Sequence, residues 1–263
     1  MSKTDREIET PVRGLNCIPV AGIFLLVLVG IFATPGARAQ LGEFQVAQNG
    51  QTIGSASYQY TATKQGYDST SLVKVSMQGL DYALSKDEKL SAGNQLEHAM
   101  LSATVNGEAV NVVAAPDAAQ LQLNISANGK RTTTRLAAHP GAVLLPDFDP
   151  GALETLLSLA VTQNNRDLWA ILPKEAGSIE PVRLATYPDQ EGTLDGKPLI
   201  VHHMVARIAG ANTELFSGPE NQLLQAELPD GFVLIRKDFQ LKPPARPVVP
   251  MGGDEGSAQA PAH

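Results

Sequence analysis

Residues 120–130 read QLQLNISANGK, and they show the pattern on which most of this chain is built. Leu121, Leu123 and Ile125 alternate with polar residues, which is the period of a β-strand with one face on a core and the other in water. Asn128-Gly129 follows, and this pair tolerates the positive φ angles of a two-residue type I′ turn. The stretch therefore predicts a strand that ends in a tight β-hairpin.

The same two signals recur along the chain. Apolar and polar residues also alternate over 56–63 and 73–77. Further turn pairs are Asn49-Gly50, Asn106-Gly107, Asp195-Gly196 and Asp230-Gly231. Alternating runs joined by such pairs predict a mainly β fold, a curved antiparallel meander of hairpins.

One segment, 147–165, breaks this pattern and predicts a helix at about 150–163. Asp149 can cap its start, Pro150 suits the first helical position, and Glu154 is placed in the first turn, where it suits the helix dipole. Three- and four-residue spacing places these residues on one apolar face: Leu153, Leu156, Leu157, Ala160 and Val161. We expect this face to cover the inner side of the sheet.

Beyond the helix the chain returns to strands. The predicted strands are 168–172, 182–187, 199–208, 212–217, 222–228 and 232–240. The sequence shows no repeat of fixed period, so we expect one domain over 41–242.

The N-terminal segment has the parts of a secretory signal. A charged leader precedes an uncharged apolar run over 17–33, and Ala37-Arg38-Ala39 offers small residues to a signal peptidase. We therefore predict a signal peptide over 1–39, cleaved between Ala39 and Gln40. The alternative is an uncleaved inner-membrane anchor over 17–34, since the leader carries as many acids as bases. Both interpretations place the domain outside the cytoplasm, as a periplasmic or secreted protein.

The C-terminal segment 243–263 is rich in proline, glycine and alanine and has no periodic apolar residues. Such a segment cannot bury enough surface to offset the entropy of ordering it. We predict a disordered tail.

Composition and motifs argue against several functions. The formal charge is −7 and no basic cluster is present, which argues against nucleic acid as a partner. Cys17, the only cysteine, precedes the predicted cleavage point, so the mature chain has no thiol chemistry. The sequence has no phosphate-binding glycine motif and no nucleophile elbow. We predict no catalytic residue, no cofactor and no metal ligand.

Two adjacent histidines, His202 and His203, lie in the apolar run LIVHHMVARI over 199–208. Neighbours on a strand point to opposite faces, so the pair cannot chelate one ion. Both faces are otherwise apolar. The run therefore predicts a central strand with two hydrogen-bonded core histidines rather than metal ligands.

Four large aromatic residues could line an apolar cavity: Phe148, Trp169, Tyr187 and Phe216. Ordinary core packing is the alternative, because aromatic side chains dominate cores in any case.

The two ends of the domain resemble a known type. The opening run is QVAQNGQTIGSASYQY, and the closing run over 214–239 is ELFSGPENQLLQAELPDGFVLIRKDF. The closing run is similar to the C-terminal hairpin of exported β-rich bacterial domains of unknown function, which carry a Trp-x-Asp-x-x-Gly-x-Leu-Leu turn. Phe216 stands in place of the tryptophan, and Pro219-Glu220-Asn221 replaces the acidic-glycine turn. The positions that fit are Leu223, Leu224, Val233 and Arg236.

This resemblance implies a LolA-like half-barrel, in which a curved sheet and a helical lid enclose an apolar concavity, and it implies no catalytic residue. The first functional hypothesis is therefore noncatalytic binding of an apolar or lipid-like ligand in the cell envelope. The second is a structural or protein-interaction module of the envelope that has no ligand cavity. The third is an accessory domain of a hydrolase, or an enzyme whose site is assembled from dispersed residues.

Overall fold

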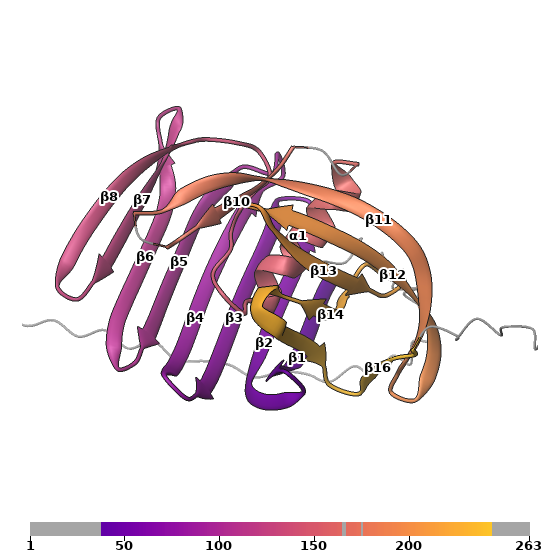
Figure 1. The fold of residues 1–263 in the computed structure, drawn as a ribbon. Helices are drawn as coiled ribbons and strands as arrows, with labels where there is room; N and C mark the ends of the chain where they lie inside the picture. The colour runs from indigo at the N-terminus through magenta and orange to yellow at the C-terminus, as the bar shows by residue number, and fades with distance from the viewer. Residues whose placement is uncertain (1–37, 165–166, 175, 244–263) are drawn as a thin grey trace, which may run out of the picture. The chain divides into compact units, whose positions relative to one another are not determined.

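A computed structural model describes residues 38–164, 167–174 and 176–243 (Figure 1). The predicted signal or anchor segment lies outside the described residues, apart from Arg38 and Ala39. The predicted tail also lies outside them, apart from Pro243. No helix in the described part of the chain has the length and apolar character needed to cross a membrane.

Eight consecutive strands form the first half of the described fold. They are β1 (Arg38–Gln48), β2 (Gln51–Thr63), β3 (Gly66–Met77), β4 (Leu80–Ser91), β5 (Leu96–Val105), β6 (Glu108–Asp117), β7 (Gln120–Ala127) and β8 (Lys130–Ala137). Each strand pairs antiparallel with the next, as the alternation and the turn pairs predict.

The second half contains the helix and the remaining strands. They are β9 (Ala142–Leu144), α1 (Pro150–Thr162), β10 (Leu168–Leu172), β11 (Ser178–Leu194), β12 (Lys197–Ile208), β13 (Ala211–Ser217), β14 (Leu223–Glu227), the short 3-10 helix η1 (Pro229–Gly231), β15 (Phe232–Arg236) and β16 (Phe239–Leu241). Among the described residues the protein is thus mainly β with a single α-helix.

All strands belong to one open sheet, in which β1 joins the two halves by pairing with β15. The path runs from β8 back to β1, across to β15 and on to β9, while β16 pairs with β11 off the path. The prediction of an antiparallel meander is wrong at one place, because β9 and β10 run parallel. The reason is the connection between them, since a helical crossover returns the chain in the same direction.

The predicted turns are confirmed in detail. Asn49, Asn106, Asn128 and Asp195 have φ angles of 50 to 52°, and the glycine after each has a φ of 70 to 83°. Both central residues of a type I′ turn require such angles. These pairs therefore form the turns of four hairpins, β1–β2, β5–β6, β7–β8 and β11–β12.

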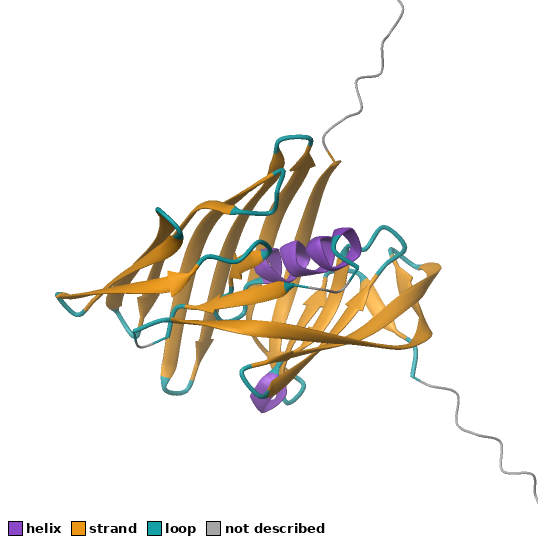
Figure 2. Ribbon diagram, turned by 90° about the horizontal axis from the view of Figure 1, so that it is seen from above, coloured by secondary structure: helices purple, strands orange, loops and turns teal. Residues whose placement is uncertain are grey.

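Helix α1 begins where the sequence predicts, with Asp149 as its cap. The Asp149 carboxylate accepts hydrogen bonds from the backbone N–H groups of Gly151 and Ala152, at 2.9 and 3.2 Å. The helix lies on one face of the sheet (Figure 2). Gly151 is pressed against the hydroxyl groups of Ser69 and Ser71 on β3, where any side chain would collide.

Two details of the helix prediction are wrong. Glu154 is not in the first turn, because Pro150 is the first helical residue. It lies in the second turn and is fully buried. Val161 does not belong to the buried face, since 58 % of it is exposed near the end of the helix.

Two strand boundaries also differ from the prediction. The run 232–240 divides into β15 and β16, because the backbone turns at Asp238, which has a φ of 61°. β11 is much longer than 182–187 and continues to Leu194 across a register shift after Tyr187. Its second half is polar and exposed, so the apolar pattern gave no signal for it.

The main core lies between the inner face of the sheet and α1. Inner-face residues such as Tyr58, Val75 and Leu84 are buried there together with Leu156 and Leu157 of the helix. The outer face of β1–β6 is therefore free of the helix and carries the residues that alternate with the core positions.

Candidate functional site

Three charged side chains lie together inside the core. The Lys86 Nζ atom is 3.0 Å from Glu88 Oε2 on the same strand, β4, and 2.7 Å from Asp149 Oδ2 at the start of α1. All three side chains are fully buried. Burial lowers the pKa of Lys86, but the two carboxylates outweigh burial and raise this pKa, so the ammonium stays charged.

This charged cluster completes the hydrogen bonding of a sheet edge. β9 ends the sheet path, so the outward-facing backbone groups of that strand have no strand beside them. Lys86 donates to the carbonyl oxygen of Leu144 at 3.1 Å, and Glu88 Oε1 accepts from the Leu144 N–H at 2.6 Å. The cluster therefore has a structural role, because it satisfies buried backbone groups that water cannot reach.

A second buried carboxylate, Glu154, joins the helix to the two halves of the sheet. Its Oε2 atom accepts from the Tyr58 hydroxyl at 2.9 Å and from the Leu223 N–H at 2.6 Å. Burial raises the pKa of Glu154 to about 7, and burial also raises the pKa of Tyr58, which keeps this hydroxyl a donor. Asp149 of the first cluster also lines a pocket at the start of α1, whereas the Glu154 side chain is fully buried.

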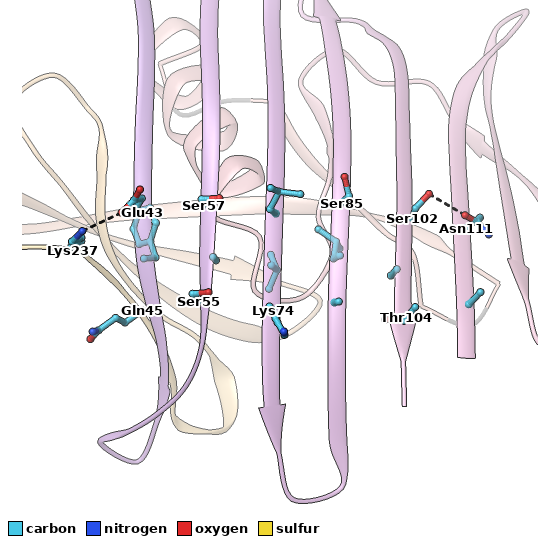
Figure 3. A pocket seen from close by; sticks show the side chains of 18 residues that line it. Glu43, Gln45, Ser55, Ser57, Lys74, Ser85, Ser102, Thr104, Asn111 and Lys237 are labelled. Carbon is cyan, nitrogen blue, oxygen red and sulfur yellow. Dashed lines mark hydrogen bonds and ion pairs between the residues drawn. The ribbon is translucent and has the colours of Figure 1, made fainter. Parts of the chain in front are cut away.

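A large pocket lies on the outer face of the sheet, across β1–β6 (Figure 3). It is an open groove of about 990 Å³. Small side chains line much of its floor: Ser55, Ser57, Ala83, Ser85, Ser102 and Ala109. The small size of these side chains hollows the surface beside the longer side chains of Leu72 and Lys74.

Strand register creates this groove by placing the small residues side by side. One cross-strand row runs from Ser57 through Leu72, Ser85 and Ser102 to Asn111. A parallel row runs from Ser55 through Lys74, Ala83 and Thr104 to Ala109. In the first row Leu72 is 60 % exposed, which leaves a large apolar side chain in the middle of the groove.

The charges of the groove are few. Lys237 lies 3.5 Å from Glu43 at one end and is partly neutralised by it. Lys74 forms no ion pair or hydrogen bond with the described residues. The groove thus combines small side chains and the exposed Leu72 with one uncompensated cation, Lys74.

The two histidines lie apart from both the groove and the core cluster. His203 is mostly buried, with 13 % of its side chain exposed, and its ring stacks on Phe216 at a centroid distance of 4.6 Å. Its Nε2 atom lies 3.1 Å from Glu214 Oε2. The prediction of a core position is wrong for His202, whose side chain is 41 % exposed and lies 3.0 Å from Asp189. Ile200, on the same face of β12, is 51 % exposed, so this face of the strand is open to solvent.

The four aromatic residues proposed to line a cavity fall into three places. Phe148 lies in the wall of a pocket beside the start of α1, and its ring is 4.9 Å from that of Phe232. Trp169 stacks on His139 at 3.7 Å. Tyr187 and Phe216 lie on either side of His203. The structure brings only the last two together.

The structure also describes the residues of the predicted cleavage point and Asp147, which precedes the helix cap. Ala39 and Gln40, at the expected cleavage point, lie at the start of β1 opposite Thr61 and Tyr60 of β2. Asp147, two residues before the helix cap Asp149, forms an exposed ion pair with Lys174 at 3.0 Å.

Sequence reasoning missed Lys86 and Glu88, although a signal for them exists. Tyr82, Leu84 and Leu90 are inner-face residues of β4, and Lys86 and Glu88 share their parity. The period of a strand therefore places both charges in the core. The run KDEKLS looks like a solvated charged segment when its alternation is ignored.

Comparisons with family models, with curated proteins and with solved structures find no match for this chain. The protein is therefore described by its fold and its pockets alone. The described residues form a mainly β domain with one open mixed sheet, one core helix and a groove on the face that the helix leaves uncovered.

Proposed function

We propose that this protein is a noncatalytic binding module for an amphiphile, a molecule with an apolar chain and an anionic group, held in the outer groove. One observation carries the proposal. The groove exposes Leu72 and small side chains along its floor and one unpaired cation, Lys74. Apolar chains gain free energy by burial against such a floor, and an anionic group is attracted by the lysine.

The dimensions of the groove suit a chain rather than a compact ligand. It crosses β1–β6, five steps of about 4.8 Å between strands, or roughly 24 Å in all. A lipid chain in one leaflet of a bilayer spans roughly 15 Å, half of the hydrocarbon core. An extended acyl chain therefore fits across the strands.

We further propose that the protein is exported and that its domain is of the LolA-like half-barrel type. The N-terminal apolar run and the Ala-x-Ala site support export to the periplasm or beyond. An open sheet with a single helix is compatible with the LolA-like half-barrel type, which the closing run 214–239 resembles. The proposed ligand site differs from that type, because it lies on the outer face rather than under the helix.

Filling the groove is expected to abolish ligand binding without unfolding the protein. Ser85→Trp places an indole in the centre of the floor, and we expect the affinity for a fluorescent fatty acid to fall at least tenfold, about 1.4 kcal/mol. The matched control is Ser76→Trp, because Ser76 is exposed on the same face of β3 but does not line the groove. Binding is measured by fluorescence titration, and folding by thermal unfolding.

Two further measurements test the charge preference of the groove and identify the bound molecule. Lys74→Glu is expected to weaken the fatty acid and to favour dodecyltrimethylammonium, since the charge at the groove changes sign. Mass spectrometry of an organic extract of the protein from its native compartment identifies what it carries. Equal binding by Ser85→Trp and Ser76→Trp, or a clean extract together with no fatty-acid binding, would contradict the proposal.

A protein-interaction module is the second candidate, and one observation favours it. Met100 and Val113 lie opposite each other on the outer face of β5 and β6, and Leu41 is exposed on the outer face of β1. Together with Leu72 they give this face an apolar character that a protein partner could cover. Stoichiometric co-purification of a protein partner that Ser85→Trp prevents would support this candidate over the first.

A further inference from the structure

A smaller pocket at the N-terminal end of α1 is built differently from the groove. Its volume is about 330 Å³, at the lower end of the range for ligand sites. It lies between the loop 145–149, the end of β10 and the segment of η1. Its apolar wall consists of Leu80, Leu145, Leu153, Leu172, Leu228, Phe148 and Phe232.

Two phenylalanine rings form the aromatic part of this wall. Phe148 and Phe232 meet edge to face, with centroids 4.9 Å apart and planes at 70°. Phe148 is held on its other side by Tyr82 at 5.9 Å, although its backbone has a φ of 58°, an unusual angle for a bulky residue. Faces of aromatic rings attract cations through their quadrupole.

The ionised groups around the pocket are mainly acidic. Lys86 neutralises Asp149 from within the core, and Lys174 pairs with Asp147 at the rim. Asp230 is an exposed residue that also lines the pocket, and its side chain forms no ion pair or hydrogen bond with the described residues. Of the three aspartates around the pocket, Asp230 is therefore the one that no cation in the described residues pairs with.

We infer that this pocket binds a small organic cation, an amine carried on a compact apolar body. The leucines and the two phenylalanines take the apolar part, and Asp230 takes the ammonium group. This site is separate from the outer groove and does not rest on the amphiphile proposal, because the two pockets share no residue.

The test uses a pair of probes that differ in charge. We expect phenethylamine to bind the full-length protein at least tenfold more tightly than 3-phenylpropionate, by titration with NMR detection. Asp230→Asn is expected to weaken phenethylamine at least fivefold. The matched control is Asp238→Asn, because Asp238 is also exposed with a φ of 61° but lies outside the pocket. Asparagine tolerates this backbone angle, so both variants keep their turns.

The outcomes separate the two sites. Unchanged phenethylamine binding in Ser85→Trp, with loss in Asp230→Asn alone, supports the inference whether or not the groove binds an amphiphile. Equal affinity for both probes, no binding of either at millimolar concentration, or equal losses in Asp230→Asn and Asp238→Asn would overturn it.

Discussion

Replacing Lys86 by methionine is expected to lower the free energy of unfolding by about 3 to 5 kcal/mol, the cost of leaving buried charges without a partner. In the native protein the Lys86 ammonium faces Glu88, Asp149 and the carbonyl of Leu144. Methionine fills much of the same volume but donates no hydrogen bond. Two carboxylates would then face each other in the core, and the edge of β9 would lose its donor. Urea unfolding followed by circular dichroism measures the change.

The matched control is Lys89→Met on the same strand. Lys89 pairs with Glu97 at 2.9 Å, but both side chains are about two-fifths exposed. Water screens such a pair, so the loss is expected to be much smaller than for Lys86→Met. A loss for Lys86→Met no larger than for the control would show that the buried cluster does not stabilise the fold.

A double variant tests the explanation itself. In Lys86→Met/Glu88→Gln the glutamine keeps an acceptor for the Leu144 N–H, which Glu88 Oε1 provides at 2.6 Å. It also removes one of the two unpaired charges. We therefore expect the double variant to be more stable than Lys86→Met alone. Adding the Glu88→Gln single variant completes the cycle that gives the coupling between the two residues.

Replacing Glu154 by glutamine is expected to change the pH dependence of stability. Burial raises the pKa of Glu154 from 4.5 to about 7 in the folded protein, so the folded state holds a proton that the unfolded chain releases. The stabilisation that this bound proton gives to the folded state is fully present below pH 4.5, and it is lost as the pH rises through 7. Between pH 4 and pH 8 the loss amounts to roughly 3 kcal/mol.

Glutamine mimics the protonated carboxyl group at every pH. Its carbonyl oxygen can keep the hydrogen bonds from Tyr58 and Leu223, which both go to one carboxylate oxygen. We therefore expect Glu154→Gln to match the wild type near pH 4 and to be the more stable protein at pH 8. Urea unfolding at a series of pH values measures the difference, in which the contributions of other groups cancel.

The control for this experiment is Glu108→Gln, at the exposed start of β6. It removes one carboxylate from a solvated position, so its stability curve should run parallel to that of the wild type. Parallel curves for Glu154→Gln as well would mean that Glu154 is ionised in the folded state, contrary to the expected proton.

Local features of the sequence determined the elements and the turns. Asn-Gly and Asp-Gly pairs adopt positive φ angles through their own backbone preferences, so the hairpins could be located without knowing any neighbour. Asp149 and Pro150 determined where α1 begins for the same reason, and the short apolar run of β10 determined its bounds. Each of these signals acts within a few residues.

Only the tertiary structure decided which side chains from different strands lie together in the groove. Leu72, Ser85 and Ser102 belong to three strands, and only the register between the strands aligns them into the floor of a groove. His202 was mistaken for a core residue because an apolar run does not reveal whether another layer covers that face of the strand.

The buried charges show the same division. Alternation along β4 determined that Lys86 and Glu88 point inward, but not that an inward charge is tolerated there. That depended on β9 and Asp149, which are 56 or more residues away in sequence and bring the carbonyl, the N–H and the carboxylate that these charges need. Periodicity determines the direction of a side chain, and the partners that make its burial favourable come from distant parts of the chain.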